Sequence, residues 1–328
     1  MVNVFVTGAS GVLGKRLVER LADRGHRVYG LVRDESGAEI VAARGGTPRR
    51  GDVLDRASLE RVVPDVDVLV HAATSIPTAR KPSAAAWERN DRVRLDGVRN
   101  LVSVAGDRLE RVLFPSVVWV ARQPDGERFD ETADRHPDRT SRSAAAVEDF
   151  LTGESDDGRF DVTLLRCGFF YAPDAAHTRQ FGRSLLSRDF PIVGRGPLGR
   201  GDARLSFLHA DDAARAFATA VDADVSGSYH VVDDRPTTLA DFLTTLAGKL
   251  AAPAPRRLPA WLARFVIGAE NAALLLKPMP TSNDRFTAAT GWEPTYPNCE
   301  NGLEQVASTW EADGTLRETD GGYAWTDG

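Results

Sequence analysis

Apolar residues recur along this chain with two different periods. Residues 2–6 form an apolar run broken only by an Asn, which predicts a short buried strand. Soon after it, apolar residues return at the spacing of a helix, at Leu13, Leu17, Val18 and Leu21. A strand followed by an amphipathic helix is the repeating unit of a parallel sheet, so this pattern indicates the fold class.

The same unit recurs through most of the chain. Further apolar runs predict strands at residues 26–32, just before 51, and at 66–70, 111–118, 161–166 and 229–232. The helices between these strands are predicted at residues 57–63, 84–104, 144–151 and 211–221. Strands that alternate with helices predict an α/β fold with a doubly wound, seven-stranded parallel sheet.

Three glycines stand between the first strand and the first helix, at Gly8, Gly11 and Gly14. Glycines at this spacing permit a tight turn, a close approach of phosphate to the backbone, and close packing of the helix. The helix start presents free N–H groups and the positive end of its dipole. The turn therefore predicts a dinucleotide site, with an ordinary strand-to-helix turn as the alternative. The predicted contacts are Gly8, Ser10, Gly11, Val12, Leu13 and Gly14.

The ends of the second and third strands are predicted to bind the adenosine part of the dinucleotide. Arg33 suits the 2′-phosphate of NADP, and the acid that would suit NAD is not at the strand tip, since Asp34 comes one residue later. The sequence therefore favours NADP, with NAD as the second choice and a solvated surface Arg33 as the alternative. Asp52 is expected to accept a hydrogen bond from adenine, and Val53 to cover its ring. Asp52 alternatively caps the next helix, although Asp55 lies nearer to it.

Ligands bind at the carboxyl ends of parallel strands, so the ends of the fourth and fifth strands are further candidates. His71, Ala72 and Ala73 end the fourth strand, and the two small residues let the backbone pass close to a cofactor. A packing role is the alternative for His71. Thr74 follows and is predicted to contact the substrate, and Ser116 lies near the end of the fifth strand.

The amino-acid composition and the predicted elements change in the later part of the chain. Residues 172–204 are rich in Gly and Pro, and residues 236–328 carry mainly helical patterns interrupted by prolines. We therefore expect a dinucleotide-binding domain of residues 1–170 plus 205–235. The remaining residues, 171–204 plus 236–328, are expected to form a small, mainly helical cap that binds the substrate.

Composition limits the partners and the location. The net charge is −6, so no basic field favours nucleic acid or an anionic membrane. The longest apolar stretch, residues 258–276, is interrupted by an Arg, a Glu and an Asn, which argues against a membrane span. Cys167 and Cys299 form no metal or disulfide pattern. With a strand where a secretory signal would stand, these features predict a cytoplasmic protein that holds no metal.

Five segments carry more specific motifs, namely TGASGVLG (7–14), GDVLD (51–55), HAAT (71–74), SFLHADDAARA (206–216) and TGWEPTYPNCENGL (290–303). Together they resemble the extended short-chain dehydrogenase/reductase family, also called the NAD-dependent epimerase/dehydratase family. The resemblance implies a Rossmann-type fold, a nicotinamide cofactor and a small-molecule substrate. It also implies that His209 and Asp212 hold the fold together.

Two finer expectations rest on the same resemblance. Residues 32–34 are similar to the reductase branch that includes dihydroflavonol reductases and 3β-hydroxysteroid dehydrogenases, which again favours NADP. Helices corresponding to residues 84–104 and 144–152 pair subunits in many relatives, which implies a homodimer.

The catalytic set that the resemblance implies is not intact. The family uses a Tyr with a Lys four residues later, a Ser or Thr that orients the substrate oxygen, and an upstream Asn. In the best alignment Thr140 stands at the Tyr position, Ala144 at the Lys position and Arg94 at the Asn position. Ser116 keeps the Ser, but none of the five tyrosines has a Lys four residues later. Thr has no pKa near 7 and Ala144 has no charge, so the usual carbonyl reduction should be slow or absent.

The favoured function is an NAD(P)-dependent enzyme that acts on a small apolar or aromatic substrate with a non-standard catalytic set of Ser116, Arg94 and Thr140. Water or the substrate then supplies any proton. An inward-pointing Arg94 would hold a carboxylate or stabilise an oxyanion, whereas an Arg94 on the helix surface would do neither. Tyr171 is expected to contact the substrate. The resemblance also implies that the apolar helix at residues 259–268 lines the substrate pocket, with simple packing on the sheet as the favoured alternative for most of its residues.

Two other functions stay open. A non-catalytic dinucleotide-binding, scaffold or regulatory protein suits the intact glycines and the lost catalytic residues equally well. A nucleotide-sugar epimerase or dehydratase is least favoured, because such enzymes need the Tyr and the Lys. Their substrate-phosphate Arg also lies four residues before the position of His209, where this chain has Leu205 with Arg204 beside it.

Overall fold

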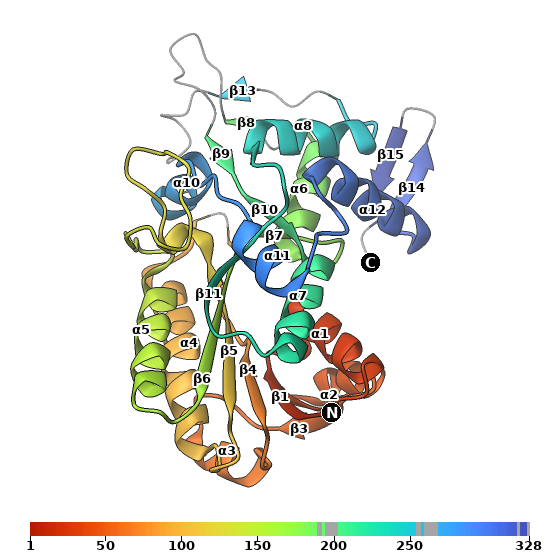
Figure 1. The fold of residues 1–328 in the computed structure, drawn as a ribbon. Coiled ribbons are helices and arrows are strands. Elements are labelled where there is room, and N and C mark those ends of the chain that lie inside the picture. The colour runs from red at the N-terminus through yellow and green to blue at the C-terminus, as the bar shows by residue number, and fades with distance from the viewer. Residues whose placement is uncertain are drawn as a thin grey trace.

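The computed structural model describes residues 1–79, 81–188, 192–193, 203–253, 257–258, 268–319 and 322–326. They contain a seven-stranded sheet with helices on both faces (Figure 1). The strand order is β11-β6-β5-β4-β1-β2-β3, and every neighbouring pair is parallel. The predicted doubly wound sheet is therefore confirmed. Its strands are β1 (Asn3–Thr7), β2 (Arg27–Val32), β3 (Thr47–Arg50), β4 (Val68–His71), β5 (Arg111–Val117), β6 (Asp161–Cys167) and β11 (Gly227–Val231).

Alternate residues of each strand face opposite layers of helices. Phe5 and Phe114 pack with apolar residues of α3, α4 and α5, whereas Val4 and Leu113 pack with residues of α1 and α7. The predicted α4 agrees with the structure, and α5 is longer at both ends than predicted. The helices of the two layers are α1 (Val12–Asp23), α2 (Glu35–Ala42), α3 (Arg56–Val62), α4 (Ala84–Val104), α5 (Arg142–Asp156) and α7 (Ala210–Ala223).

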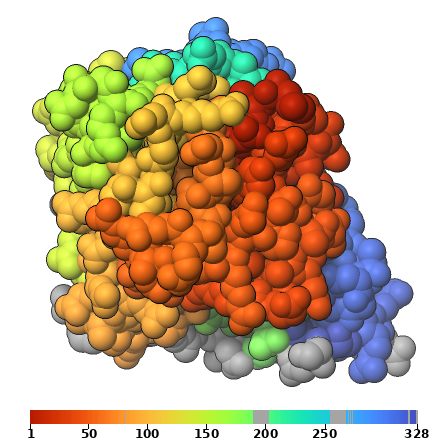
Figure 2. Space-filling model, turned by 90° about the horizontal axis from the view of Figure 1, so that it is seen from below, coloured from red at the N-terminus to blue at the C-terminus, as the bar shows by residue number. Residues whose placement is uncertain are grey.

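The later part of the chain lies at the carboxyl end of the sheet, where Figure 1 shows α6, α8, α10 and α12. Viewed from below in Figure 2, the red to yellow amino-terminal part of the chain forms most of the visible face. The apolar helix predicted at residues 259–268 lies outside the described residues, apart from its last one. The remaining helices are α6 (Ala176–Leu186), α8 (Leu239–Lys249), α10 (Ala269–Leu276), α11 (Asp284–Thr290) and α12 (Cys299–Ala312), with a short 3-10 turn η1 (Val118–Val120) after β5.

Short strand pairs tie this later part together. One of them, the antiparallel pair of residues 316–319 and 322–325, was not predicted, because its sequence lacks an alternating apolar pattern. It is stabilised instead by tertiary contact, since the ring of Trp325 packs edge-on against Trp310 of α12 at 5.0 Å. The pairs are β7 (Phe169–Tyr171) with β10 (Phe207–His209), β9 (Arg204–Leu205) with β12 (Thr237–Thr238), β8 (Ile192–Val193) with β13 (Arg257–Leu258), and β14 (Leu316–Thr319) with β15 (Gly322–Trp325).

His209 and Asp212 join the two parts of the molecule, as the resemblance implies. Both side chains are fully buried at the start of α7. The Nε2 atom of His209 lies 3.1 Å from the side-chain oxygen of Gln305 in α12. Asp212 accepts the backbone N–H groups of Thr295 and Tyr296 at 2.8 and 2.9 Å. Their structural role is therefore confirmed.

Asp233, which follows β11, is a buried acid. Its side chain is 1 % exposed, and neither carboxyl oxygen has a hydrogen-bond partner of good geometry in the described part of the chain. Burial raises the pKa of Asp233 well above its usual value, and the neighbouring Asp234 and Asp212 add to this, while the backbone amide of Arg235 offsets only part of it. We therefore expect the folded protein to keep this proton at pH values where the unfolded chain has lost it.

Asp233→Asn should remove a pH-dependent loss of stability. The pKa of Asp233 is higher in the folded than in the unfolded protein. The protonated acid therefore contributes its full stability below the unfolded pKa of about 3.9. That contribution decreases by about 1.4 kcal/mol per pH unit as the pH rises toward the folded pKa. The Tm of the variant should therefore rise relative to wild type between about pH 5 and pH 8. Thermal unfolding followed by circular dichroism measures this, with the exposed Asp23→Asn as control. A constant Tm difference would contradict a buried, protonated Asp233.

Candidate active site

The glycine turn between β1 and α1 has no room for side chains at two of its positions. Gly8 has a φ of +64°, and a Cβ there would stand 2.6 Å from the carbonyl oxygen of Ala72. A Cβ at Gly14 would overlap the carbonyl oxygen of Gly8. Gly11 precedes α1 and provides no side-chain cap for the first N–H groups of the helix. A nicotinamide dinucleotide fits this turn, because its pyrophosphate can accept from those uncapped amides.

The turn lies where the winding of the sheet reverses, since β1 has β2 on one side and β4 on the other. A side-chain contact links the ends of β1 and β4. The hydroxyl oxygen of Thr7 lies 2.9 Å from Nδ1 of His71 and accepts the backbone N–H of Ala73 at 3.2 Å. The backbone of Ala72 and Ala73 therefore stands beside the glycine turn.

The His71 side chain points into the protein. Its Nε2 atom lies 3.0 Å from the carbonyl oxygen of Arg94, and its ring stacks on Phe114. The carbonyl can only accept, so Nε2 carries the proton and Nδ1 accepts from the Thr7 hydroxyl. Burial lowers the pKa of His71 to about 4, so the ring is neutral at pH 7. The side chain has the packing role, and a cofactor contact by the backbone of His71 stays a prediction.

The candidate adenosine residues lie at the ends of β2 and β3. Arg33 is exposed directly after β2. Asp34 caps α2 by accepting a backbone N–H at 2.9 Å, so this acid is already engaged next to Arg33. Asp52 is exposed and Val53 is buried, and Asp55 caps α3. The alternative that Asp52 is the cap is therefore wrong, and adenine contacts by Asp52 and Val53 stay predictions.

Ser116 is not free to orient a substrate. Its hydroxyl donates to Glu148 of α5 at 2.5 Å, and its side chain is 1 % exposed. Glu148 in turn accepts two hydrogen bonds from Arg166 of β6, at 3.0 and 2.8 Å. This placement corrects the expectation of a catalytic Ser116. Because side chains alternate along a strand, Val117 points to the opposite face, and its apolar side chain stands at the end of β5.

The Thr140 hydroxyl, just before α5, is already engaged as well. The Thr140 hydroxyl donates to Asp138 at 2.7 Å, and the Thr140 backbone N–H donates to the same carboxylate at 2.9 Å. This turn leads into α5, so the Thr140 hydroxyl has a structural partner, which does not support a catalytic role for it. Ala144 is fully buried in the apolar cluster under α5.

Arg94 points inward, so the alternative of a surface Arg94 is wrong. The side chain is 3 % exposed. One guanidinium nitrogen lies 3.5 Å from the hydroxyl of Ser143, next to Ala144. Burial lowers the pKa of Arg94 to about 10, against the opposing effect of Asp91, so the group remains charged at neutral pH. A cation therefore stands next to the position where the family pattern expects a lysine.

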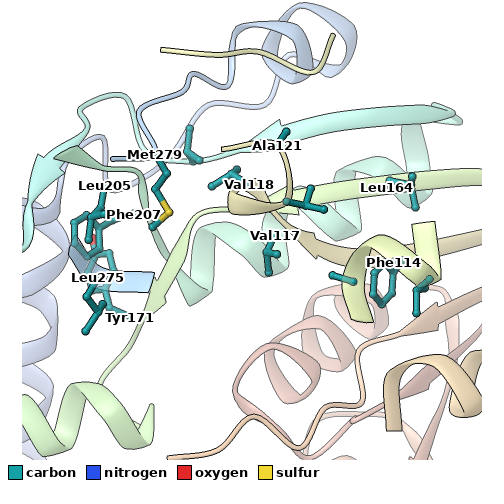
Figure 3. Packing of buried hydrophobic residues seen from close by; sticks show 14 of the residues in the cluster. Phe114, Val117, Val118, Ala121, Leu164, Tyr171, Leu205, Phe207, Leu275 and Met279 are labelled. Carbon is teal, nitrogen blue, oxygen red and sulfur yellow. The ribbon is translucent and has the colours of Figure 1, made fainter. Parts of the chain in front are cut away.

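The two predicted substrate residues lie in different environments. Thr74 is exposed in the loop after β4. Tyr171 is fully buried, and its ring meets Phe207 and Phe242 edge-on. Figure 3 shows Tyr171 grouped with Leu205 and Phe207, in a different part of the core from Val117. This corrects the expectation for Tyr171, because its side chain has no surface to offer a substrate.

Trp87 and Asn90, which the sequence pattern did not single out, lie on the same side of α4 as Arg94. Their spacing of i, i+3 and i+7 places all three on one face of a helix. A Trp, an Asn and an Arg on the buried face of an amphipathic helix were a signal, since polar groups are seldom buried without partners. Arg139 was missed as well, and its guanidinium lies over the Trp87 ring at 5.6 Å.

The sequence pattern of the NAD dependent epimerase/dehydratase family matches residues 4–232. With the glycine turn and the reversal of winding at β1, this match defines a Rossmann-fold protein of the extended short-chain dehydrogenase/reductase type. The chain belongs to the NAD-dependent epimerase/dehydratase family, whose members use a nicotinamide dinucleotide and act on small molecules.

Two curated relatives are reductases. A 3-diazoavenalumate denitrifying reductase from a Streptomyces species is 34 % identical over 315 residues, which cover 92 % of this chain and 98 % of the relative. A 4-hydroxy-2-methyl-3-oxo-4-farnesyl-3,4-dihydroquinoline-1-oxide ketoreductase from Stigmatella aurantiaca is 28 % identical over 74 % of this chain and 71 % of the relative.

Solved structures share the fold at low identity. A human epimerase family protein crystallised with NADPH has a TM-score of 0.77 and 19 % identity, covering 93 % of this chain and 99 % of that protein. A UDP-glucose 4-epimerase from Thermus thermophilus, solved with NAD, has a TM-score of 0.76 and 24 % identity, covering 94 % of this chain and 99 % of that protein.

Within the described ranges, no helix has both the length and the apolar character needed to cross a membrane. The same residues include no group of three or more His, Cys, Asp or Glu side chains placed to hold a metal ion.

A lysine at position 144 would place a second buried cation beside Arg94, and the two positive charges would repel each other. Ala144→Lys should then destabilise the protein by about 3 kcal/mol or more, because it buries an unpaired charge. Adding Arg94→Asn should recover at least about 1 kcal/mol of that loss. Urea unfolding of the double-mutant cycle measures the coupling, with Ala146→Lys on the half-buried side of α5 as control. Additive effects would place the two positions apart.

Proposed function

We propose that this chain is an NAD(P)H-dependent reductase that removes a diazo group, as dinitrogen, from a small aromatic substrate. One observation carries the proposal. The dinucleotide turn is intact, yet the neighbouring strand and helix ends present Val117, an engaged Thr140 hydroxyl and Ala144 in place of a proton-donating set. The 34 % identity to a denitrifying reductase of a diazo compound supports the same chemistry.

The reaction balances without an enzymatic acid. Bound NAD(P)H supplies a hydride, whose electron pair forms the new C–H bond. The C–N bond breaks, and its electron pair leaves with neutral dinitrogen, so that R–N2+ and NAD(P)H give R–H, N2 and NAD(P)+. Carbonyl reduction differs, because it leaves an oxyanion that needs a proton. His71 beside the candidate site is neutral and buried, and the cation of the site is an arginine. This arrangement suits reduction of the diazo group and does not suit carbonyl reduction.

Several finer assignments belong to this proposal. The dinucleotide domain is taken as residues 1–170 plus 205–235, with the rest as the substrate-binding cap. We place the protein in the reducing cytoplasm, since both Cys167 and Cys299 are buried free thiols. A homodimer through α4 and α5 rests on the family resemblance. A nucleotide-sugar epimerase is not proposed, because Leu205, at the position expected for the phosphate-binding Arg, is fully buried.

Diazo reduction is tested directly. The protein is incubated with NADPH and 3-diazo-4-hydroxybenzoate carrying 15N in the diazo group, and the labelled dinitrogen is measured by mass spectrometry. We expect one dinitrogen per NADPH oxidised, and deuterium in the product ring when the transferred hydrogen of NADPH is deuterium. Gly8→Val, which cannot form the turn, is the inactive control, and simple aromatic ketones should not be reduced. NADPH binding without any turnover would favour the non-catalytic alternative.

The choice of NADP over NAD rests on Arg33. Arg33→Ala should weaken NADPH binding about tenfold and leave NADH binding nearly unchanged, because only NADPH carries the 2′-phosphate. Nicotinamide fluorescence titration measures both constants, and the exposed Arg56→Ala on α3 serves as the matched control. An equal effect on both dinucleotides would remove Arg33 from cofactor selection.

A further inference from the structure

A buried stripe of hydrogen-bond donors runs along α4. Trp87, Asn90 and Arg94 are 4 %, 0 % and 3 % exposed. Each has a donor nitrogen that finds no acceptor among the described residues, namely Nε1 of Trp87, Nδ2 of Asn90 and Nε of Arg94. Buried donors without partners are uncommon and costly in folded proteins. Three of them on one helix face point to a missing acceptor.

The contacts of the stripe place it at the ligand-binding end of the sheet. Oδ1 of Asn90 accepts the backbone N–H of Ser75, in the loop after β4, at 3.0 Å. That bond fixes the amide, so Nδ2 must be the group left to donate. Arg94 approaches Ser143 at the start of α5, which lies beside α4 (Figure 1). The donors thus lie between the segments that follow β4 and β5, where ligands of such sheets bind.

The charges around the stripe favour an anion. Asp91 is the carboxylate whose charge acts on Arg94, and it accepts from Arg139 at 2.9 Å and from Arg142 at 2.8 Å. Two guanidinium groups therefore donate to one oxygen of this carboxylate, and its other oxygen has no partner among the described residues. In the same part of the chain, no carboxylate accepts a hydrogen bond from the Arg94 guanidinium. A planar guanidinium and two neutral N–H donors on the same helix face offer several N–H groups to the two oxygens of a carboxylate.

We propose that Trp87, Asn90 and Arg94 bind the carboxylate of the substrate, so that the reductase acts on an aromatic acid held with its acid group against α4. The inference deepens the proposed function and rests on it for the identity of the reacting group. The carboxylate site itself can be tested without any turnover.

The test compares acids with their neutral amides. Benzoate, 4-hydroxybenzoate and 4-hydroxycinnamate, and the three matching carboxamides, are titrated into the protein with NADP present and followed by calorimetry. We expect at least one acid to bind about 10- to 100-fold more tightly than its amide, as charge-assisted hydrogen bonds imply. Equal binding of each pair, or no binding of any acid, would overturn the proposal.

Two variants and one control assign the effect to the stripe. Arg94→Gln should reduce the acid-to-amide preference to about one, because the cation is lost. Asn90→Asp keeps the acceptor for Ser75 but replaces the free donor with a negative charge, so it should weaken acid binding and spare amide binding. Arg92→Gln, whose side chain is 67 % exposed on the same helix, should change neither. Circular dichroism melting confirms that each variant is folded, and a preference that survives Arg94→Gln would place the acid elsewhere.

The two proposals fail in different ways. If acids are preferred but no diazo compound is reduced, the carboxylate site stands and the proposed reaction does not. If a diazo acid and its diazo amide are reduced with equal KM, the reaction stands and the carboxylate site does not.

Discussion

The close approach of the turn after β1 to the end of β4 is the contact on which the candidate site depends. Gly8 has no side chain because the backbone of Ala72 occupies the space where one would stand. Thr7 and His71 then hold the two segments together through side-chain hydrogen bonds. The same contact sets where α1 begins and where the chain leaves β4 toward α4, so it positions both the dinucleotide turn and the donor stripe.

A buried ion pair fixes the other side of the site. Glu148 of α5 binds Arg166 of β6 through both carboxylate oxygens and also accepts from Ser116 of β5. Three elements are thereby held in one arrangement, because breaking a buried pair leaves an uncompensated charge. The chemical consequence is that the one side chain that matched the catalytic pattern of the family, Ser116, is used for structure.

Two departures from the catalytic pattern of the family, one on α4 and one on α5, lie close together in space. Near the start of α5 an alanine stands in place of a lysine, and from α4 an arginine reaches the neighbouring Ser143. The arginine keeps its charge, whereas burial keeps His71 neutral, so neither group exchanges a proton near pH 7. Under the proposed function, Arg94 orients an anion without giving up a proton, and hydride transfer with a neutral leaving group asks for no proton, unlike reduction of a carbonyl.

Much of this protein is determined by local sequence. The period of apolar residues specifies the strands and helices, because each strand–helix unit is formed by neighbours along the chain. The glycine spacing specifies the dinucleotide turn, and the nearness of Asp55 to α3 specifies its cap. The inward direction of the Arg94 side chain and the burial of the donor stripe on α4 could not be predicted from local sequence. Both depend on which face of α4 meets α5.

The partners of the polar side chains were decided only by the tertiary structure. Ser116 donates to Glu148, which is 32 residues later, and Tyr171 is enclosed by Phe207 and Phe242. The strand pattern shows that Ser116 is near the end of β5 but not which face it takes, since a shift of one residue reverses the direction of the side chain. The sequence by itself therefore determined the fold and the dinucleotide turn, and the packing of α4 and α5 on the sheet decided which polar groups remain free for a substrate.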